Sequence, residues 1–333
     1  MTVSQVLDND FQSIYDDLHQ LKRSLAGIIV GQEEIIEDLI LAIFSGGHTL
    51  LEGLPGLGKT HLAKAFAGSL GVSMSRIQCT PDLMPADITG TEILVHDSLN
   101  QQQFHFQKGP IFACMVLVDE INRATPKTQS ALLEAMQEHQ ITFAGKCYPL
   151  PEPFSVIATQ NPIELEGTYP LPEAQLDRFV FKLNVQYPSA SSLHDMINVS
   201  LDDEPADHVK PVLSSDRIRE IRHVLPEVII AEPLKSAAID LVLSTQARSE
   251  QSHPLADKHF RYGASPRALH AILRTARVRA LLDGRVHVSM DDLRHVSLPA
   301  LRHRILLNLN SEMDSVSVDC VLKEILNEWY SKN

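Results

Sequence analysis

The 333-residue sequence contains no apolar run that approaches the ~20 residues needed for a membrane-spanning helix. Residues 1–11 are polar and acidic, and they lack the basic start and apolar centre of a secretory signal. Both absences argue against membrane insertion and against export. We therefore expect a cytoplasmic protein that does not insert into a membrane.

Paired metal ligands are also missing. The four cysteines are far apart in the sequence, so neither a zinc site with paired thiolates nor a disulfide framework is indicated. The 15 histidines include no H-E-x-x-H or similar ligand spacing. No internal repeat or low-complexity tract is visible. These absences disfavour a zinc enzyme and a repeat scaffold.

Positive charge is scarce, since 29 Lys and Arg residues face 42 Asp and Glu residues and the formal net charge is −13. A nucleic-acid motor usually presents a basic surface, so this balance argues against one. Segment 258–304 is the exception, with ten Lys or Arg residues and three acidic ones. It is either a solvated helical face or a surface that meets a neighbour's phosphates, and composition alone leaves both open.

A phosphate-binding motif stands at residues 53–60, which read G-x-x-x-x-G-K-T between a short apolar strand and a helical stretch. Its glycines let successive backbone N–H groups point at one anion, and the helix N-terminus adds partial positive charge. Lys59 is predicted to reach the β- and γ-phosphates, and Thr60 Oγ to bind Mg²⁺. The alternative is a glycine-rich turn with an incidental lysine. The motif predicts nucleotide binding.

Two adjacent carboxylates, Asp119 and Glu120, end the continuous apolar run 114–118, which is typical of a strand buried in a parallel sheet. One such acid can hold the magnesium shell and the second can polarise the water that attacks the γ-phosphate. We assign Asp119 to the metal and Glu120 to the water. A solvated strand end is the alternative.

Strands alternate with helices up to residue 187, which predicts an α/β fold with a parallel sheet and sites at the carboxyl ends of its strands. We expect a helix over 1–27 and two inserted β-hairpins, at 91–106 and 141–150. The predicted domains are an ATPase core at 1–187, a linker region at 188–213 containing one helix, and an all-helical part at 214–333.

Five blocks carry a family resemblance: the phosphate loop, V-L-V-D-E-I-N-R-A at 116–124, A-T-Q-N-P at 158–162, L-P-E-A-Q-L-D-R-F at 171–179 and G-A-S-P-R-A at 263–268. In this order they closely resemble the MoxR-type AAA+ ATPases. The resemblance implies a sandwiched P-loop sheet with a helical lid and assembly into rings, usually hexameric. It also implies ATP-driven remodelling of separate protein clients, often with a von Willebrand A domain, for complex assembly or for cofactor or metal insertion.

The resemblance also implies residue roles. Asn161 matches the first sensor, although an Asn-Pro turn would look the same. Arg178 matches the finger that reaches a neighbouring subunit's γ-phosphate, with helix capping as its alternative and Arg123 as its rival. Arg267 matches the second sensor and can act on its own subunit's nucleotide or on a neighbour's. Val30 and Gly31 match the loop beside the adenine, and the two hairpins match loops that face the central pore.

The predicted site residues form three sets. The catalytic set is Lys59, Glu120, Asn161, Arg178 and Arg267. The metal ligands are Thr60 and Asp119. The nucleotide contacts are Val30, Gly31, Gly53, Pro55, Gly56, Leu57, Gly58, Lys59, Thr60 and His61, with ATP and Mg²⁺ as the expected ligands.

Two other functional classes compete with this interpretation. A DNA-directed ring ATPase of a related clade is permitted by the basic segment 258–304, whereas the net charge opposes it. A non-hydrolysing nucleotide switch is opposed by the intact acidic pair and by Asn161.

Overall fold

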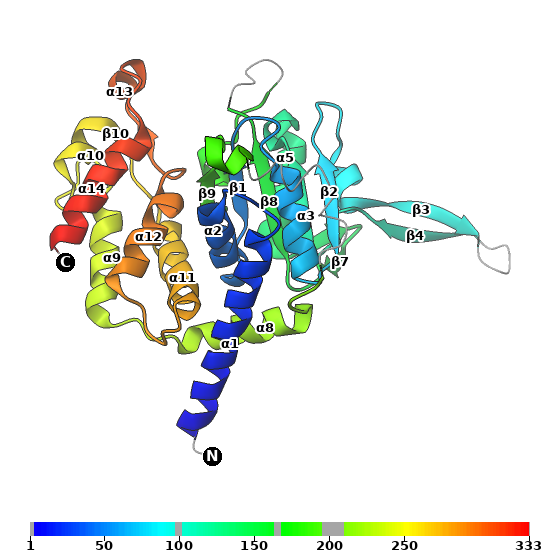
Figure 1. The fold of residues 1–333 in the computed structure, drawn as a ribbon. Helices are drawn as coiled ribbons and strands as arrows, with labels where there is room; N and C mark the ends of the chain where they lie inside the picture. Colours follow the sequence, from blue (N-terminus) through cyan, green and yellow to red (C-terminus); the bar gives the residue numbers. More distant parts are fainter. Residues whose placement is uncertain (1–2, 97–101, 163–167, 195–209, 333) are drawn as a thin grey trace.

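The computed structural model describes residues 3–96, 102–162, 168–194 and 210–332. Its centre is a five-stranded parallel sheet in the order β2-β5-β8-β1-β9 (Figure 1). The strands are β1 (Thr49–Glu52), β2 (Met74–Gln78), β5 (Met115–Asp119), β8 (Ser155–Gln160) and β9 (Phe181–Asn184). The predicted α/β sheet is confirmed, with strand ends shifted by one or two residues.

The sheet is covered on both faces because alternate side chains of each strand point in opposite directions. Leu51, Leu117 and Ile157 belong to one hydrophobic cluster, together with residues of α2 (Glu33–Phe44) and α3 (Lys59–Ser69). Their strand neighbours Leu50, Val116 and Ala158 pack into a second cluster with α5 (Pro126–Glu138). The core is therefore the sandwich that the resemblance implied.

Two antiparallel hairpins leave the sandwich. The first joins β3 (Gly90–His96) to β4 (Gln102–Lys108) after the short helix α4 (Pro85–Thr89), and it projects far from the body (Figure 1). The second joins β6 (Gln140–Phe143) to β7 (Lys146–Pro149). The rings of Phe106 and Tyr148 stack with centroids 4.3 Å apart, so the hairpins contact each other. Residues 97–101, in the middle of the hairpin expected at 91–106, lie outside the described residues.

The C-terminal part is mainly helical. Its helices are α8 (Ser215–Val224), α9 (Glu232–Ser244), α10 (Pro254–His259), α11 (Pro266–Leu282), α12 (Met290–Leu301), α13 (Leu309–Met313) and α14 (Val318–Lys332). A small antiparallel pair, β10 (Phe260–Tyr262) and β11 (Leu306–Leu307), accompanies them. Three short helices lie elsewhere in the chain: η1 (Ile121–Arg123), α6 (Glu173–Leu176) and η3 (Leu225–Glu227). Most of the predicted linker, 195–209, lies outside the described residues, and 190–194 are helical.

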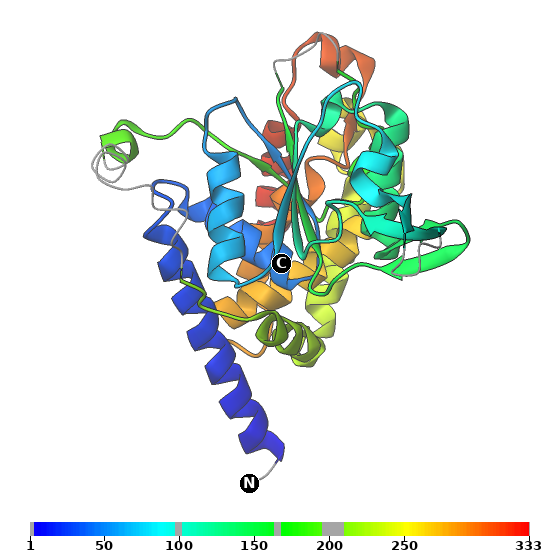
Figure 2. The same ribbon diagram turned by 90° about the vertical axis from the view of Figure 1, so that its right-hand side faces the viewer.

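Helix α1 (Val3–Ala26) joins the lid helices to the core. Its side chains Ile14, Leu18, Leu21 and Leu25 are buried in one continuous cluster with residues of α2 and of the C-terminal helices. Arg217 of α8 forms an ion pair with Asp17 of α1 at 2.7 Å. In both overall views α1 runs along the body and its amino end projects beyond it (Figures 1 and 2). The helices beyond residue 214 therefore share their core with the amino-terminal part, and the domain boundaries stay a prediction.

No helix in the described ranges combines the length and the apolar composition required to cross a membrane.

Candidate nucleotide site

The predicted phosphate loop, the acidic pair and Asn161 meet at one edge of the sheet. They follow the carboxyl ends of β1, β5 and β8, which are adjacent in the order β5-β8-β1. Gly56 and Gly58 have φ angles of +82° and +76°, which L-residues with side chains rarely adopt. A Cβ at either position would meet no protein atom within 4 Å, so the space in front of them is open to a phosphate. The loop therefore fits a nucleotide.

The remaining loop residues support this geometry. Gly53 passes so close to β9 that a Cβ would lie 2.8 Å from the carbonyl oxygen of Val185. Lys59 Nζ donates a hydrogen bond to the Gly53 carbonyl oxygen at 2.6 Å, which holds the ammonium group across the loop. Thr60 and His61 occupy the first turn of α3, and both are partly exposed.

Asp119 and Glu120 are held by different partners. Asp119 is buried, and its Oδ2 accepts a hydrogen bond from Arg76 Nε at 2.6 Å. The Glu120 carboxylate accepts from Arg123 Nη1 at 3.0 Å and from Gln78 Nε2 at 3.3 Å. Arg76 and Gln78, both on β2, were not recognised in the sequence. Arg123, the rival finger, therefore lies beside the acidic pair of its own chain.

Thr159 connects the two acids. The Glu120 backbone N–H donates to Thr159 Oγ1 at 2.9 Å, and the same hydroxyl donates to Asp119 Oδ1 at 3.4 Å. Glu120 has a φ of +55°, an unusual conformation for a residue with a side chain. Thr159 is 2% exposed, so water cannot replace its hydroxyl. The sequence alone did not indicate this role of Thr159.

We predict that Thr159→Val disturbs the site while preserving side-chain shape. The partly buried Glu120 amide would lose its acceptor, at a cost of about 1–3 kcal/mol in the free energy of unfolding. ATP turnover should fall on the order of tenfold because Glu120 is no longer fixed. Thermal unfolding and steady-state phosphate release measure both effects. Thr159→Ser retains the hydroxyl and is the control; equal behaviour of the two variants would contradict the role.

The loop expected beside the adenine lies next to the phosphate loop. Gly31 has a φ of +74°, and a Cβ there would come within 2.4 Å of Ser192 Oγ. The next residue, Gln32, is 9% exposed, and its Nε2 donates to the Leu57 carbonyl oxygen at 3.2 Å. Val30 is partly buried. Gln32 therefore connects the two loops, a contact that the sequence did not reveal.

Arg178 and Arg267 do not lie beside the phosphate loop of their own chain. Arg178 precedes β9, and the nearby Val180 N–H donates to the carbonyl oxygen of His48, just before β1 begins. The two ends of the four-residue strand β1 lie about 10 Å apart, so the phosphate loop is at the opposite end. Arg178 Nη1 donates to the Leu133 carbonyl oxygen of α5 at 2.5 Å, which differs from the helix capping considered as the alternative to the finger role.

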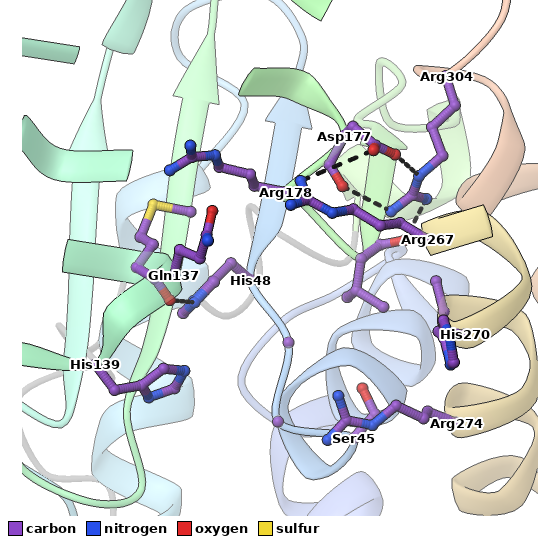
Figure 3. A pocket seen from close by; sticks show the side chains of 15 residues that line it. Ser45, His48, Gln137, His139, Asp177, Arg178, Arg267, His270, Arg274 and Arg304 are labelled. Atoms are coloured by element: carbon purple, nitrogen blue, oxygen red, sulfur yellow. Dashed lines mark hydrogen bonds and ion pairs between the residues drawn. The ribbon is translucent and has the colours of Figure 1, made fainter. Parts of the chain in front are cut away.

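A pocket of about 290 Å³ brings the two arginines together (Figure 3). Arg267, in the first turn of α11, forms an ion pair with Asp177, and Arg274 of the same helix also lines the pocket. Burial lowers the pKa of His48, at the back of the pocket, to about 4, so this imidazole is neutral at physiological pH. Arginines therefore dominate the charge of the pocket, which suits a phosphate.

Comparisons with known proteins agree with this geometry. Residues 48–181 match the family described as "ATPase family associated with various cellular activities (AAA)", and residues 253–325 match the AAA lid domain. Chaperone MoxR1 of Mycobacterium tuberculosis is 39% identical over 313 residues, which cover 93% of this chain and 82% of the relative. The chain belongs to the MoxR family of AAA+ ATPases. Protein MoxR of Methylorubrum extorquens is 32% identical over 286 residues, which cover 81% of this chain and 82% of that relative.

A solved structure resembles the whole MoxR-family chain. The crystal structure of a Cytophaga hutchinsonii protein, described as a candidate ATPase, is 38% identical, with a TM-score of 0.89 and 97% of both chains covered. The family supports nucleotide binding, ATPase activity and a chaperone role for this chain, and it suggests oligomeric assembly.

Proposed function

We propose that this MoxR-family protein is a Mg·ATP hydrolase whose active site is completed by a neighbouring copy of the same chain. One observation carries the proposal: the site residues divide between opposite ends of β1. Lys59, Asp119 and Glu120 lie at the carboxyl end, with the phosphate loop, whereas Arg178 and Arg267 lie at the amino end. Side-by-side copies would bring the two ends together, as ring assembly requires.

In this proposal the carboxyl end binds the nucleotide and activates water. Magnesium, when bound, neutralises phosphate charge, with Thr60 and Asp119 as its protein ligands. The N–H groups of residues 56–60 and the Lys59 ammonium group hold the phosphates. Glu120 accepts a hydrogen bond from the attacking water, and Asn161 orients that water or a phosphate oxygen. Val30 and Gly31 would flank the adenine.

Arg178 and Arg267 would act on the neighbour's nucleotide. Guanidinium groups suit this role because they remain charged and bind phosphate oxygens in pairs. Their position at the far end of β1 supports action between subunits for both, and the Arg123–Glu120 ion pair supports Arg178 as the finger. The stabilisation of the transition state by the neighbour makes hydrolysis dependent on assembly.

The energy of ATP hydrolysis would be used to remodel separate protein clients in the cytoplasm. A hexameric ring, clients with a von Willebrand A domain, and complex assembly or metal insertion are what the family resemblance adds. The β3–β4 hairpin is the proposed contact with the client, since Phe104 on it is 75% exposed. A side chain of this kind can hold an unfolded or loosely packed segment.

A DNA-directed motor is not proposed, because the net charge of the chain is −13 and part of the basic segment 258–304 is neutralised within the chain. Four of its arginines form ion pairs with carboxylates: Arg279, Arg285, Arg302 and Arg304. Such residues would have to break these contacts before they could bind a phosphate backbone. Stimulation of ATP hydrolysis by DNA that disappears at high salt would reverse this choice.

We predict that the turnover number rises with protein concentration and reaches a plateau as copies assemble. Phosphate release per chain is measured across a dilution series, with light scattering to follow assembly. ATP binding, which uses only the carboxyl end, should stay constant over the series and is the internal control. Undiminished turnover by a dilute monomer would contradict the shared site.

A further inference from the structure

A three-residue segment of the lid holds the backbone that carries the predicted finger. Each side chain of this 302–304 clamp donates hydrogen bonds to backbone carbonyl oxygens between residues 177 and 182. The bonds run from Arg302 to Lys182 (3.3 Å), from His303 to Phe179 (3.0 Å), and from Arg304 to Asp177 (3.2 Å), Phe179 (2.7 Å) and Val180 (3.3 Å). Burial keeps the pKa of His303 well below its ordinary value, so its Nε2–H is a neutral donor.

Arg304 also binds the side chain of Asp177, the residue immediately before the predicted finger. Its Nε lies 2.8 Å from Asp177 Oδ1, and its side chain is only 3% exposed. Ser265 Oγ lies 2.8 and 2.9 Å from the two oxygens of the same carboxylate. A guanidinium group buried to this extent needs a counter-ion, and Asp177 supplies it.

The same carboxylate touches the second predicted trans-acting residue. Arg267 Nη1 lies 3.8 Å from Asp177 Oδ2, and the Arg267 side chain remains 49% exposed. The Arg267 backbone N–H donates to Ser265 Oγ at 3.2 Å, so the hydroxyl that contacts Asp177 also caps the helix carrying Arg267. Figure 3 shows Asp177 between Arg304 and Arg267, with Arg178 extending from the same segment.

The unequal distances to the Asp177 carboxylate indicate that its partners have different roles. Buried Arg304 and partly buried Ser265 hold the carboxylate at hydrogen-bond distance, whereas half-exposed Arg267 is about one ångström farther away. Arg304 therefore neutralises Asp177 permanently, and Arg267 can exchange this contact for a phosphate at little cost. A simple core–lid fastening would not require the residue that directly precedes Arg178 to contact Arg267 as well.

We propose that Asp177, held by Arg304 and Ser265, is a positioning residue that places Arg178 and Arg267 together for action on a neighbouring subunit's nucleotide. The inference rests on the proposed function, in which both arginines act between subunits. It adds two residues, Asp177 and Arg304, that serve the reaction without touching the nucleotide. Both act through the placement of the two arginines.

The test begins with Arg304→Gln. Because misplacement of both trans-acting arginines weakens transition-state contacts, kcat should fall on the order of tenfold to a hundredfold, with the Kd for ATP unchanged. Arg294→Gln is the matched control. It removes an arginine of the lid helix α12 that donates to Asn327 of α14 and lies outside the 302–304 clamp, and it should retain wild-type kcat. Arg304→Lys keeps the charge and should recover part of the loss.

Mixed assemblies separate positioning from a merely structural role. Glu120→Gln subunits cannot turn over ATP at their own site, yet they carry an intact Asp177–Arg304 pair beside the neighbour's site. Mixing them with Arg304→Gln subunits should restore turnover well above that of either variant alone. A loss of fold within the Arg304→Gln subunit would not be rescued, and thermal unfolding with ATP-binding measurements detects it independently.

The same mixing distinguishes failure of this inference from failure of the proposed function. Arg178→Ala mixed with Glu120→Gln reports on the shared site alone. If Arg178→Ala is rescued and Arg304→Gln is not, or if Arg304→Gln retains wild-type kcat, the positioning role is wrong. If neither variant is rescued, the shared site itself is wrong. Should Arg304→Gln fail to fold, Asp177→Asn, which keeps the residue's shape, takes its place with the same expected results.

Discussion

Glu120→Gln should retain ATP binding and lose turnover, with kcat reduced on the order of a hundredfold to ten-thousandfold. The substitution keeps the size of the side chain and its hydrogen bond to the β2 residue Gln78, but an amide cannot polarise water as a carboxylate does. Binding persists because the phosphate loop and Lys59 are untouched. Phosphate release and equilibrium binding of a fluorescent ATP analogue measure the two effects.

A matched control is Glu312→Gln, the same chemical change at an exposed position on α13. It should leave both measurements unchanged. If Glu120→Gln hydrolysed ATP at the wild-type rate, another residue would have to activate the water, and Asp119 would be the next carboxylate to test. A loss of ATP binding would instead show that Glu120 belongs to the nucleotide cradle.

Arg178→Ala should lower kcat on the order of a thousandfold, the size expected for loss of an arginine finger. The fold should survive, because within the described residues this side chain makes one hydrogen bond, to the Leu133 carbonyl oxygen of α5. Its removal should cost about 1 kcal/mol. Turnover, thermal unfolding and gel filtration of the assembled protein test the three expectations together.

Arg123→Ala provides the comparison that separates the two candidate fingers. Arg123 contacts Glu120 of its own chain, so its loss damages the site to which it belongs. Mixing with Glu120→Gln subunits should therefore rescue Arg178→Ala and leave Arg123→Ala inactive. The reverse pattern would assign the finger to Arg123 and contradict the division of residues between the two ends of β1.

The sequence predicted the sandwich and the cradle because their signals are local. Continuous apolar runs such as 114–118 indicate buried strands, and the glycine spacing of 53–60 belongs to a single turn. Both hairpins were also expected within a few residues of their observed positions. Such elements can be predicted without knowing which residues far apart in the sequence are in contact.

The contacts that were missed are long-range. Arg304 and Asp177 are 127 residues apart, Gln32 and Leu57 are 25 apart, and β10 pairs with β11 across an intervening stretch that contains two long helices. Neither residue type nor spacing marks such pairs. Arg304 in particular resembled one more positive charge in the basic segment 258–304, since nothing in that segment distinguishes a buried arginine from a solvated one.

Helix α1 restricts the relative motion of the core and the lid helices. Because α1 is buried simultaneously against α2 and α11, the nucleotide-binding sandwich cannot swing relative to the lid helices without opening a continuous apolar seam. Each polypeptide should thus behave as a stiff block on the timescale of turnover. In a working assembly the conformational change would then occur at the interfaces between subunits. ATP hydrolysis would rotate whole subunits as rigid bodies relative to one another.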